Sequence, residues 1–166
     1  MGCGYQFRAA GEPMGIELQS LAIPLIESSS SELGFEATFT KVFRDAFISK
    51  TKVPLLPEAK AEAVLTGRIY EIRTEPIAFD QMQKTVDGRV TNYSVTSRRQ
   101  VILKMEAKFT IRATGEVLWR EPAMVERASY DVGTDPLDNR FNEQQAYELI
   151  ARALADRLFL KSTERF

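Results

Sequence analysis

The segment VILKMEAKFTIRA, residues 101–113, alternates apolar and polar side chains from Leu103 onward. Successive side chains of a β-strand point to opposite sides, so this alternation sorts the two kinds onto opposite faces. The polar face carries Lys104, Glu106, Lys108, Thr110 and Arg112. We therefore predict a long antiparallel strand that buries one face and exposes the other to water.

Turn residues bound this strand on both sides. Asp87-Gly88 predicts a turn before it, and Thr114-Gly115 predicts a turn after it. The first turn should connect back to a strand over Ala63–Thr74, which Pro76 should interrupt because proline cannot donate to a β-ladder. The second turn should lead into a return strand over Glu116–Arg127.

Two further segments have helical periodicity. Apolar side chains recur at three- and four-residue intervals in Glu32–Lys50 and in Glu143–Lys161, where Asn142 is the expected N-cap. We interpret both stripes as core faces and not as ligand-binding faces. Ser20–Ile26 is expected to be a further strand, and Ser129–Asn139 a loop. The residues predicted to be most buried are Phe39, Phe43, Phe47, Leu103, Phe109, Trp119, Ile150 and Leu154.

These elements predict an α+β fold. Both helices have one apolar stripe and need a sheet face to cover. We expect a two-layer sandwich, with the two helices on one face of a mostly antiparallel sheet of roughly four strands. The 166 residues should form a single domain, residues 1–166, in which residues 1–14 are an extended lead-in.

Composition excludes several classes of function. The 22 basic and 23 acidic residues give a net charge of −1, which does not favour a nucleic-acid partner. No stretch is apolar enough for a transmembrane helix. The chain has no histidine and one cysteine, which rules out Ser-His-Asp and Cys-His catalysis and a zinc site. We therefore expect no catalytic residues, no metal and no cofactor.

The single cysteine, Cys3, leaves three interpretations open. An N-myristoylation signal would need Ser or Thr where Gln6 stands. A bacterial lipoprotein signal would end with a small residue such as Gly2 before a lipidated cysteine. The third interpretation is a surface cysteine without a role.

The segment from Gln81 to Arg112 is locally basic. It contains seven basic and two acidic residues, 7 − 2 = +5, in a chain of net charge −1. This stretch is either a solvated strand that its cations protect from aggregation or a stripe that binds phosphate or carboxylate groups. Arg98, Lys104, Lys108 and Arg112 share the polar face by alternation. The candidate ligand-binding residues are Arg89, Arg98, Arg99, Lys104, Lys108 and Arg112.

Eight short pieces follow one another in an order typical of a known family. They are CGYQF (3–7), LAIP (21–24), LGFEATFTKVFRDAFI (33–48), AEAVLTGRI (61–69), TEPIAFD (74–80), DGRVTNY (87–93), TGEVLWRE (114–121) and ARALADRL (151–158). In this order, and with a leading cysteine, the chain resembles the LptE family of lipopolysaccharide-assembly lipoproteins of the Gram-negative outer membrane. The α+β sandwich of that family agrees with the fold predicted from periodicity.

The resemblance implies a function and a location. It implies a lipid on Cys3, with Gly2 as the residue before the cleavage site and Met1 as an artificial start. It also implies a domain that faces the periplasm, is anchored in the outer membrane, and partners the LptD β-barrel in barrel assembly and lipopolysaccharide delivery. Two alternatives stay open: a periplasmic lipoprotein that activates a cell-wall synthase or pilots a secretin, and a structural plug without a ligand of its own.

Overall fold

The computed structural model describes residues 18–29 and 34–164. Cys3 and the expected lead-in over residues 1–14 lie outside the described residues. The elements, in chain order, are β1 (Leu21–Ala22), β2 (Glu27–Ser28), α1 (Glu36–Ile48), the 3-10 helix η1 (Glu58–Lys60), β3 (Ala63–Val86), β4 (Arg89–Ile111), β5 (Val117–Asp131) and α2 (Pro136–Glu164).

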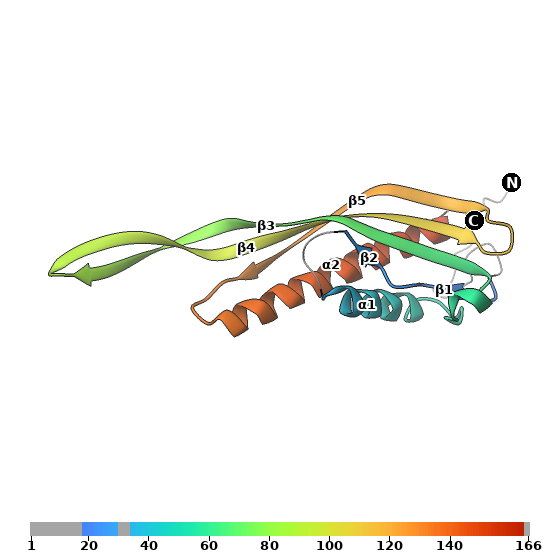
Figure 1. Ribbon diagram of the computed structural model, residues 1–166, viewed down its shortest axis with the longest axis horizontal. Helices are drawn as coiled ribbons and strands as arrows, with labels where there is room; N and C mark the ends of the chain where they lie inside the picture. Colours follow the sequence, from blue (N-terminus) through green and yellow to red (C-terminus); the bar gives the residue numbers. More distant parts are fainter. Residues whose placement is uncertain (1–17, 30–33, 165–166) are drawn as a thin grey trace, which may run out of the picture.

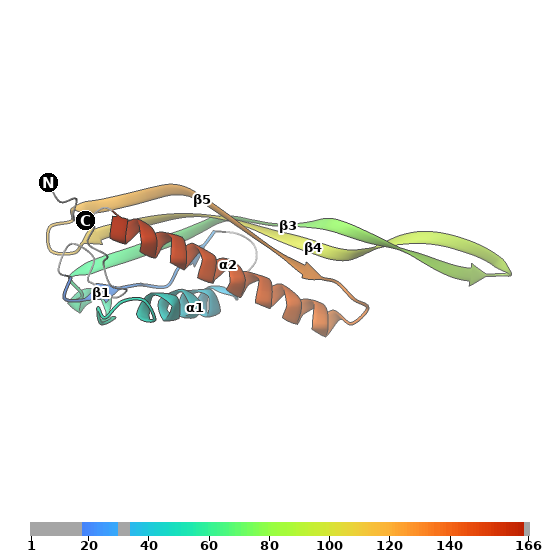
Figure 2. The same cartoon turned by 180° about the vertical axis from the view of Figure 1, so that it is seen from behind.

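The predicted fold class is confirmed. The strands form one sheet in the order β1-β3-β4-β5, and β2 also pairs with β3. β1 and β2 run parallel to β3, whereas the β3–β4 and β4–β5 pairs are antiparallel. α1 and α2 lie side by side on one face of this sheet (Figures 1 and 2). The other face, which we call the outer face, is covered by neither α1 nor α2.

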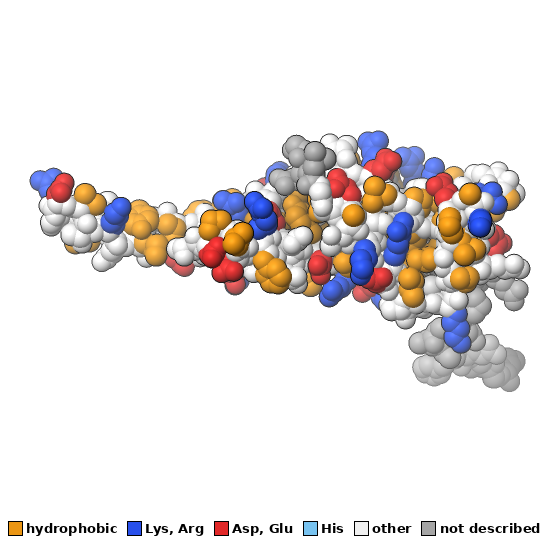
Figure 3. All heavy atoms as spheres, turned by 60° about the horizontal axis from the view of Figure 1, so that its bottom comes forward, with side chains coloured by type: hydrophobic (Ala, Val, Ile, Leu, Met, Phe, Trp, Pro, Cys, Tyr) orange, Lys and Arg blue, Asp and Glu red, His pale blue; other side chains and the backbone are white. Residues whose placement is uncertain are grey.

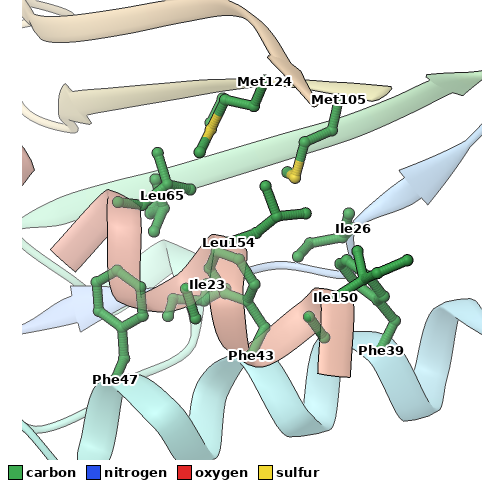
Figure 4. Close-up of a cluster of buried hydrophobic side chains, with 14 of the residues drawn as sticks. Ile23, Ile26, Phe39, Phe43, Phe47, Leu65, Met105, Met124, Ile150 and Leu154 are labelled. Atoms are coloured by element: carbon green, nitrogen blue, oxygen red, sulfur yellow. The ribbon is translucent and has the colours of Figure 1, made fainter. Parts of the chain in front are cut away.

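The core lies between the two layers. All eight residues predicted to be most buried are at most 2% exposed. Phe39, Phe43 and Phe47 project from α1 into the space between the helices and the sheet (Figure 4). Their rings stack along the helix, with centroid distances of 6.3 Å and 5.5 Å. The apolar stripe of α1 is therefore a core face, as its periodicity predicted.

The expected interruption of β3 at Pro76 is wrong. β3 continues for ten residues past the proline to Val86, with irregular register between Pro76 and Phe79. The strand β2 pairs with β3 only at Arg68 and Ile69, so β3 is an edge strand at Pro76. An edge strand tolerates proline because no neighbouring strand needs the missing N–H, and a bulge absorbs the change in register.

The predicted boundaries around α2 are also wrong. Ser129–Asp131 belongs to β5, and α2 begins at Pro136. Proline suits the first helical position because its missing N–H has no partner within the helix. The side-chain oxygen of Asp135 accepts a hydrogen bond from the backbone N–H of Leu137 at 2.8 Å. Asp135 therefore caps the helix, and Asn142, the expected N-cap, lies inside it.

Two other elements are shorter than expected. The predicted helix over Glu32–Lys50 begins at Glu36 and ends at Ile48. The predicted strand over Ser20–Ile26 is reduced to β1, and the chain pairs with β3 again only at β2. Both β1 and β2 are two-residue strands, so the edge of the sheet next to α1 is formed mainly by irregular chain.

The hairpin of β3 and β4 projects beyond the rest of the molecule (Figure 1). β5 accompanies β4 only as far as the pair Arg98–Asp131. Beyond that pair, residues 79–96 form a two-stranded arm, which we call the distal hairpin. The Asp87-Gly88 turn closes it, with positive φ angles of 50° and 72°. Positive φ at both central residues is the type I′ geometry that suits the twist of two paired strands.

Candidate functional site

Two of the candidate cations on the outer face are already paired with acids. Lys104 Nζ lies 2.8 Å from Glu71 Oε2, and the two residues are direct neighbours across β3 and β4. Arg98 Nε lies 2.7 Å from Asp131 Oδ1, across β4 and β5. The hydrogen bond from Lys104 lowers the pKa of Glu71, and the hydrogen bond to Asp131 raises the pKa of Arg98. Glu71 and Arg98 therefore stay charged at neutral pH.

Lys108 and Arg112 differ from those two residues. Lys108 lies on the outer face, opposite Thr66 of β3, and has no ion-pair partner among residues 18–29 and 34–164. Arg112 follows the last residue of β4, and its Nε donates a hydrogen bond to the carbonyl oxygen of Ala61 at 2.7 Å. Its guanidinium is thus held by the backbone at the end of the sheet.

Arg89 and Arg99 lie apart from the other candidates. Arg89 directly follows the turn at the tip of the hairpin. At a strand rise of ~3.3 Å per residue, it lies about 50 Å from Lys104 along β4. Arg99 lies on the helix-bearing face, because adjacent residues of a strand alternate between faces. There it lines a cavity of about 280 Å³ together with Tyr130, Arg140 and Glu143.

Tyr130, which lines the same cavity as Arg99, has a raised pKa. Its hydroxyl donates a hydrogen bond to Glu143 Oε1 at 3.1 Å. Burial of the phenol and the nearby charge of Glu143 raise the pKa of Tyr130, and Arg99 partly offsets this rise. The hydroxyl is therefore neutral at physiological pH and serves as a hydrogen-bond donor that links β5 to α2.

The structure adds two cations to the outer face that the sequence analysis missed. Arg68 of β3 and Arg120 of β5 both reach Glu106 of β4, at 3.7 Å and 3.0 Å. Together with Lys108 they line a cavity of about 500 Å³, and Glu27 and Glu58 line the same cavity. The charges of three basic and three acidic side chains therefore balance in the lining of this cavity.

The outer face consequently offers a weaker positive field than the sequence suggested. Arg68, Lys104, Lys108 and Arg120 share the sheet surface with three carboxylates, Glu27, Glu71 and Glu106, which leaves a surplus of 4 − 3 = +1. The distal hairpin is neutral, with two acidic and two basic residues. The basic surplus of Gln81–Arg112 thus lies at the base of the hairpin, and Figure 3 shows few charged side chains along the arm.

Residues 18–29 and 34–164 contain no group of three or more Cys, Asp or Glu side chains arranged to hold a metal ion. Within the same ranges, neither helix combines the length and the apolar character that crossing a membrane requires.

Solved structures with the same fold come from several bacteria. A protein from Xanthomonas campestris matches with a TM-score of 0.55 at 10% identity, covering 93% of this chain and 90% of that one. A candidate lipoprotein from Caulobacter crescentus matches at 0.53 and 14% identity, covering 84% and 88%. A hypothetical protein from Chlamydia trachomatis matches at 0.53 and 12% identity, covering 84% and 94%. These low identities establish a shared fold alone.

The family comparison is more specific. No curated protein matches the chain. The family model described as "LptE: Lipopolysaccharide-assembly" matches residues 18–162, from three residues before β1 almost to the end of α2. This match includes all the elements of the sheet and both helices, and it confirms the resemblance drawn from the sequence. The chain therefore belongs to the LptE family of lipopolysaccharide-assembly lipoproteins.

Proposed function

We propose that this chain is the lipoprotein partner of an LptD-type β-barrel, and that it assists barrel assembly and the delivery of lipopolysaccharide to the outer leaflet. A lipid on Cys3 anchors it in the outer membrane, with the α+β domain facing the periplasm. The observation that carries this proposal is the family match over residues 18–162. The chain acts as a binding protein and uses no cofactor.

Lipopolysaccharide binds, in this proposal, to the outer face at the base of the hairpin. Lipopolysaccharide carries phosphate and carboxylate groups, so its receiving surface needs several cations. Lys104 and Lys108 project from the same face, four residues apart, which corresponds to ~13 Å along a strand. Arg98 and Arg120 extend this surface along β4 and onto β5. Lys108 contributes most, because it forms no ion pair within residues 18–29 and 34–164, although acidic side chains line the same cavity.

Charge reversal at the base of the hairpin tests this site. We expect Lys104→Glu/Lys108→Glu to weaken lipopolysaccharide binding about five- to thirty-fold, since each exposed contact contributes at most ~1 kcal/mol. Binding is measured by fluorescence titration or surface plasmon resonance, and it should also weaken as salt screens the charges. Circular dichroism checks that the variant stays folded.

A matched variant at the tip controls for net charge. Lys84→Glu/Arg89→Glu changes the net charge by the same amount, but on the distal hairpin. We expect this variant to bind lipopolysaccharide nearly as well as the unchanged protein. If both double variants bind equally, the binding site lies elsewhere, and Lys104 and Lys108 only solubilise an exposed strand.

The partnership with a barrel has a separate test. The hairpin is the element that extends furthest from the body (Figure 2), so it is the part most available to a surrounding partner. We expect photoreactive residues at Asp87 and Arg89 to capture the barrel protein in cells, as detected by mass spectrometry of the adducts. Probes at Leu149 and Arg152 on α2 serve as the comparison. Capture from α2 but not from the hairpin would assign the docking face to the helices.

A further inference from the structure

The distal hairpin has two edges, and only one of them is protected. On the β3 side, the strand carries Pro76, Asp80 and Lys84, and its register is irregular between Pro76 and Phe79. Proline, charges and bulges are the features by which natural proteins keep edge strands from pairing with other chains. On the β4 side, residues 90–97 read VTNYSVTS, without a charge or a proline. The β4 edge is therefore open to another strand.

The register shows which backbone groups this edge presents. Val86 and Arg89 flank the two-residue turn and form a hydrogen-bonded pair, as is usual in such hairpins. Hydrogen-bonded and non-hydrogen-bonded pairs alternate along antiparallel strands, so Met82 and Tyr93 also form a hydrogen-bonded pair. Tyr93 thus turns its backbone groups inward to β3. The residues with N–H and C=O groups directed outward are Val90, Asn92, Ser94 and Thr96.

The open edge is complementary to itself. When two copies are placed antiparallel about Tyr93, the opposed residues are Val90 with Thr96, Thr91 with Val95, Asn92 with Ser94, and Tyr93 with Tyr93. In this register outward backbone groups meet outward backbone groups, and β-branched or small polar side chains face one another, as favoured across antiparallel strands. No charge meets a like charge, since Arg89 of one copy faces Ser97 of the other.

A second strand can pair with the open β4 edge only as far as Ser97. The backbone N–H of Val132 donates to the carbonyl oxygen of Ser97 at 2.9 Å, so the chain after β5 occupies the edge from Ser97 onward. Thr96 is the last outward-facing residue before that point. A second copy centred on Tyr93 would fill the open stretch and stop at Ser97, with the two bodies at opposite ends of the joined arms.

We propose that two copies of this chain pair through the β4 edges of their distal hairpins and form a four-stranded antiparallel sheet with a twofold axis at Tyr93. Such a contact is isologous, because the same segment serves both copies. The pairing covers an edge that an isolated two-stranded hairpin leaves exposed, and such a hairpin is only marginally stable in water. The proposal does not depend on lipopolysaccharide binding or on a barrel partner.

Two charge variants test the pairing: one should weaken the dimer, and the other should retain it. Asn92→Lys/Ser94→Lys would place lysine against lysine twice across the twofold axis, whereas Asn92→Lys/Ser94→Glu would place lysine against glutamate twice. Asn92 and Ser94 are both exposed in the single chain, so folding should be unaffected. In sedimentation velocity over a concentration series, we expect a dimer for the unchanged protein and for the Lys/Glu variant. The Lys/Lys variant should raise the dimer dissociation constant at least tenfold.

A cross-linking experiment tests the register independently. In a Cys3→Ala background, Tyr93→Cys should form a disulfide-linked dimer under mild oxidation, because position 93 faces itself. Met82→Cys is the control: it lies on β3, and two copies would be three strand spacings apart, ~14 Å, too far for a disulfide. A monomer at all concentrations, a dimer equally stable in both charge variants, or linkage through position 82 but not 93 would overturn the proposal.

Discussion

Phe43→Ala is expected to lower the free energy of unfolding by about 3–5 kcal/mol, a large fraction of the stability of a domain of this size. Phe43 is 1% exposed and stacks between Phe39 and Phe47 on the core face of α1. Its removal leaves a cavity between α1 and the sheet that neighbouring side chains fill only in part. Urea denaturation followed by circular dichroism gives the change from the shift of the midpoint at constant slope.

A substitution on the opposite side of the same helix separates packing from helix propensity. Ile48 is 53% exposed, and Ile48→Ala should change stability by no more than about 0.5 kcal/mol. Phe43→Leu leaves a smaller cavity and should therefore lose less stability than Phe43→Ala. It also keeps the comparison measurable if the alanine variant does not fold. Equal losses at Phe43 and Ile48 would contradict the position of α1 against the sheet.

Cys3→Ala is expected to transfer the protein from the membrane fraction to the soluble periplasmic fraction of a Gram-negative host. The protein would be produced with a lipoprotein signal peptide whose cleavage site directly precedes Cys3. Burial of acyl chains contributes ~0.8 kcal/mol per CH₂, and stable anchoring needs at least two chains. A diacylglyceryl thioether together with an N-acyl group meets this requirement, so the loss of the thiol removes the whole anchor.

Cell fractionation with immunoblotting measures the distribution, and mass spectrometry of the N-terminal peptide identifies the lipid. Tyr5→Ala serves as the matched control, because it alters the same segment but leaves the thiol in place. It should fractionate with the membranes as the unchanged protein does. If the Cys3→Ala form stays with the membranes as well, the anchor is not a lipid on this cysteine.

Local periodicity was sufficient to predict the layers of this fold. The alternation over residues 101–113 and the apolar stripes of the two helices indicate which side chains face the core, and the eight predicted to be most buried are at most 2% exposed. Element boundaries were less predictable, because they depend on neighbours that the local pattern does not contain. Pro76 is tolerated only because β3 has no further strand beside it there, which is a property of the sheet and not of the segment.

The candidate site was less predictable than the fold for a similar reason. Lys104 meets Glu71, and Arg120 meets Glu106, only through the register of paired strands, which the sequence does not specify. The position of Arg99 is different. Alternation alone already assigns Arg98 and Arg99 to opposite faces, so a single stripe could not include both.

The two-residue turn at the tip also determines where assembly of the sheet is least costly in chain entropy. Partners along the β3–β4 ladder are 3 residues apart in sequence at Val86 and Arg89, and 48 residues apart at Ala63 and Ile111. Because closing a loop costs more entropy as the loop grows, pairing that begins at the turn can proceed inward in small steps. The parallel contacts of β1 with β3, which span 42 residues from Leu21 to Ala63, have no such local start. The distal hairpin, an exposed part of the sheet, is thus the part in which strand pairing nucleates most easily.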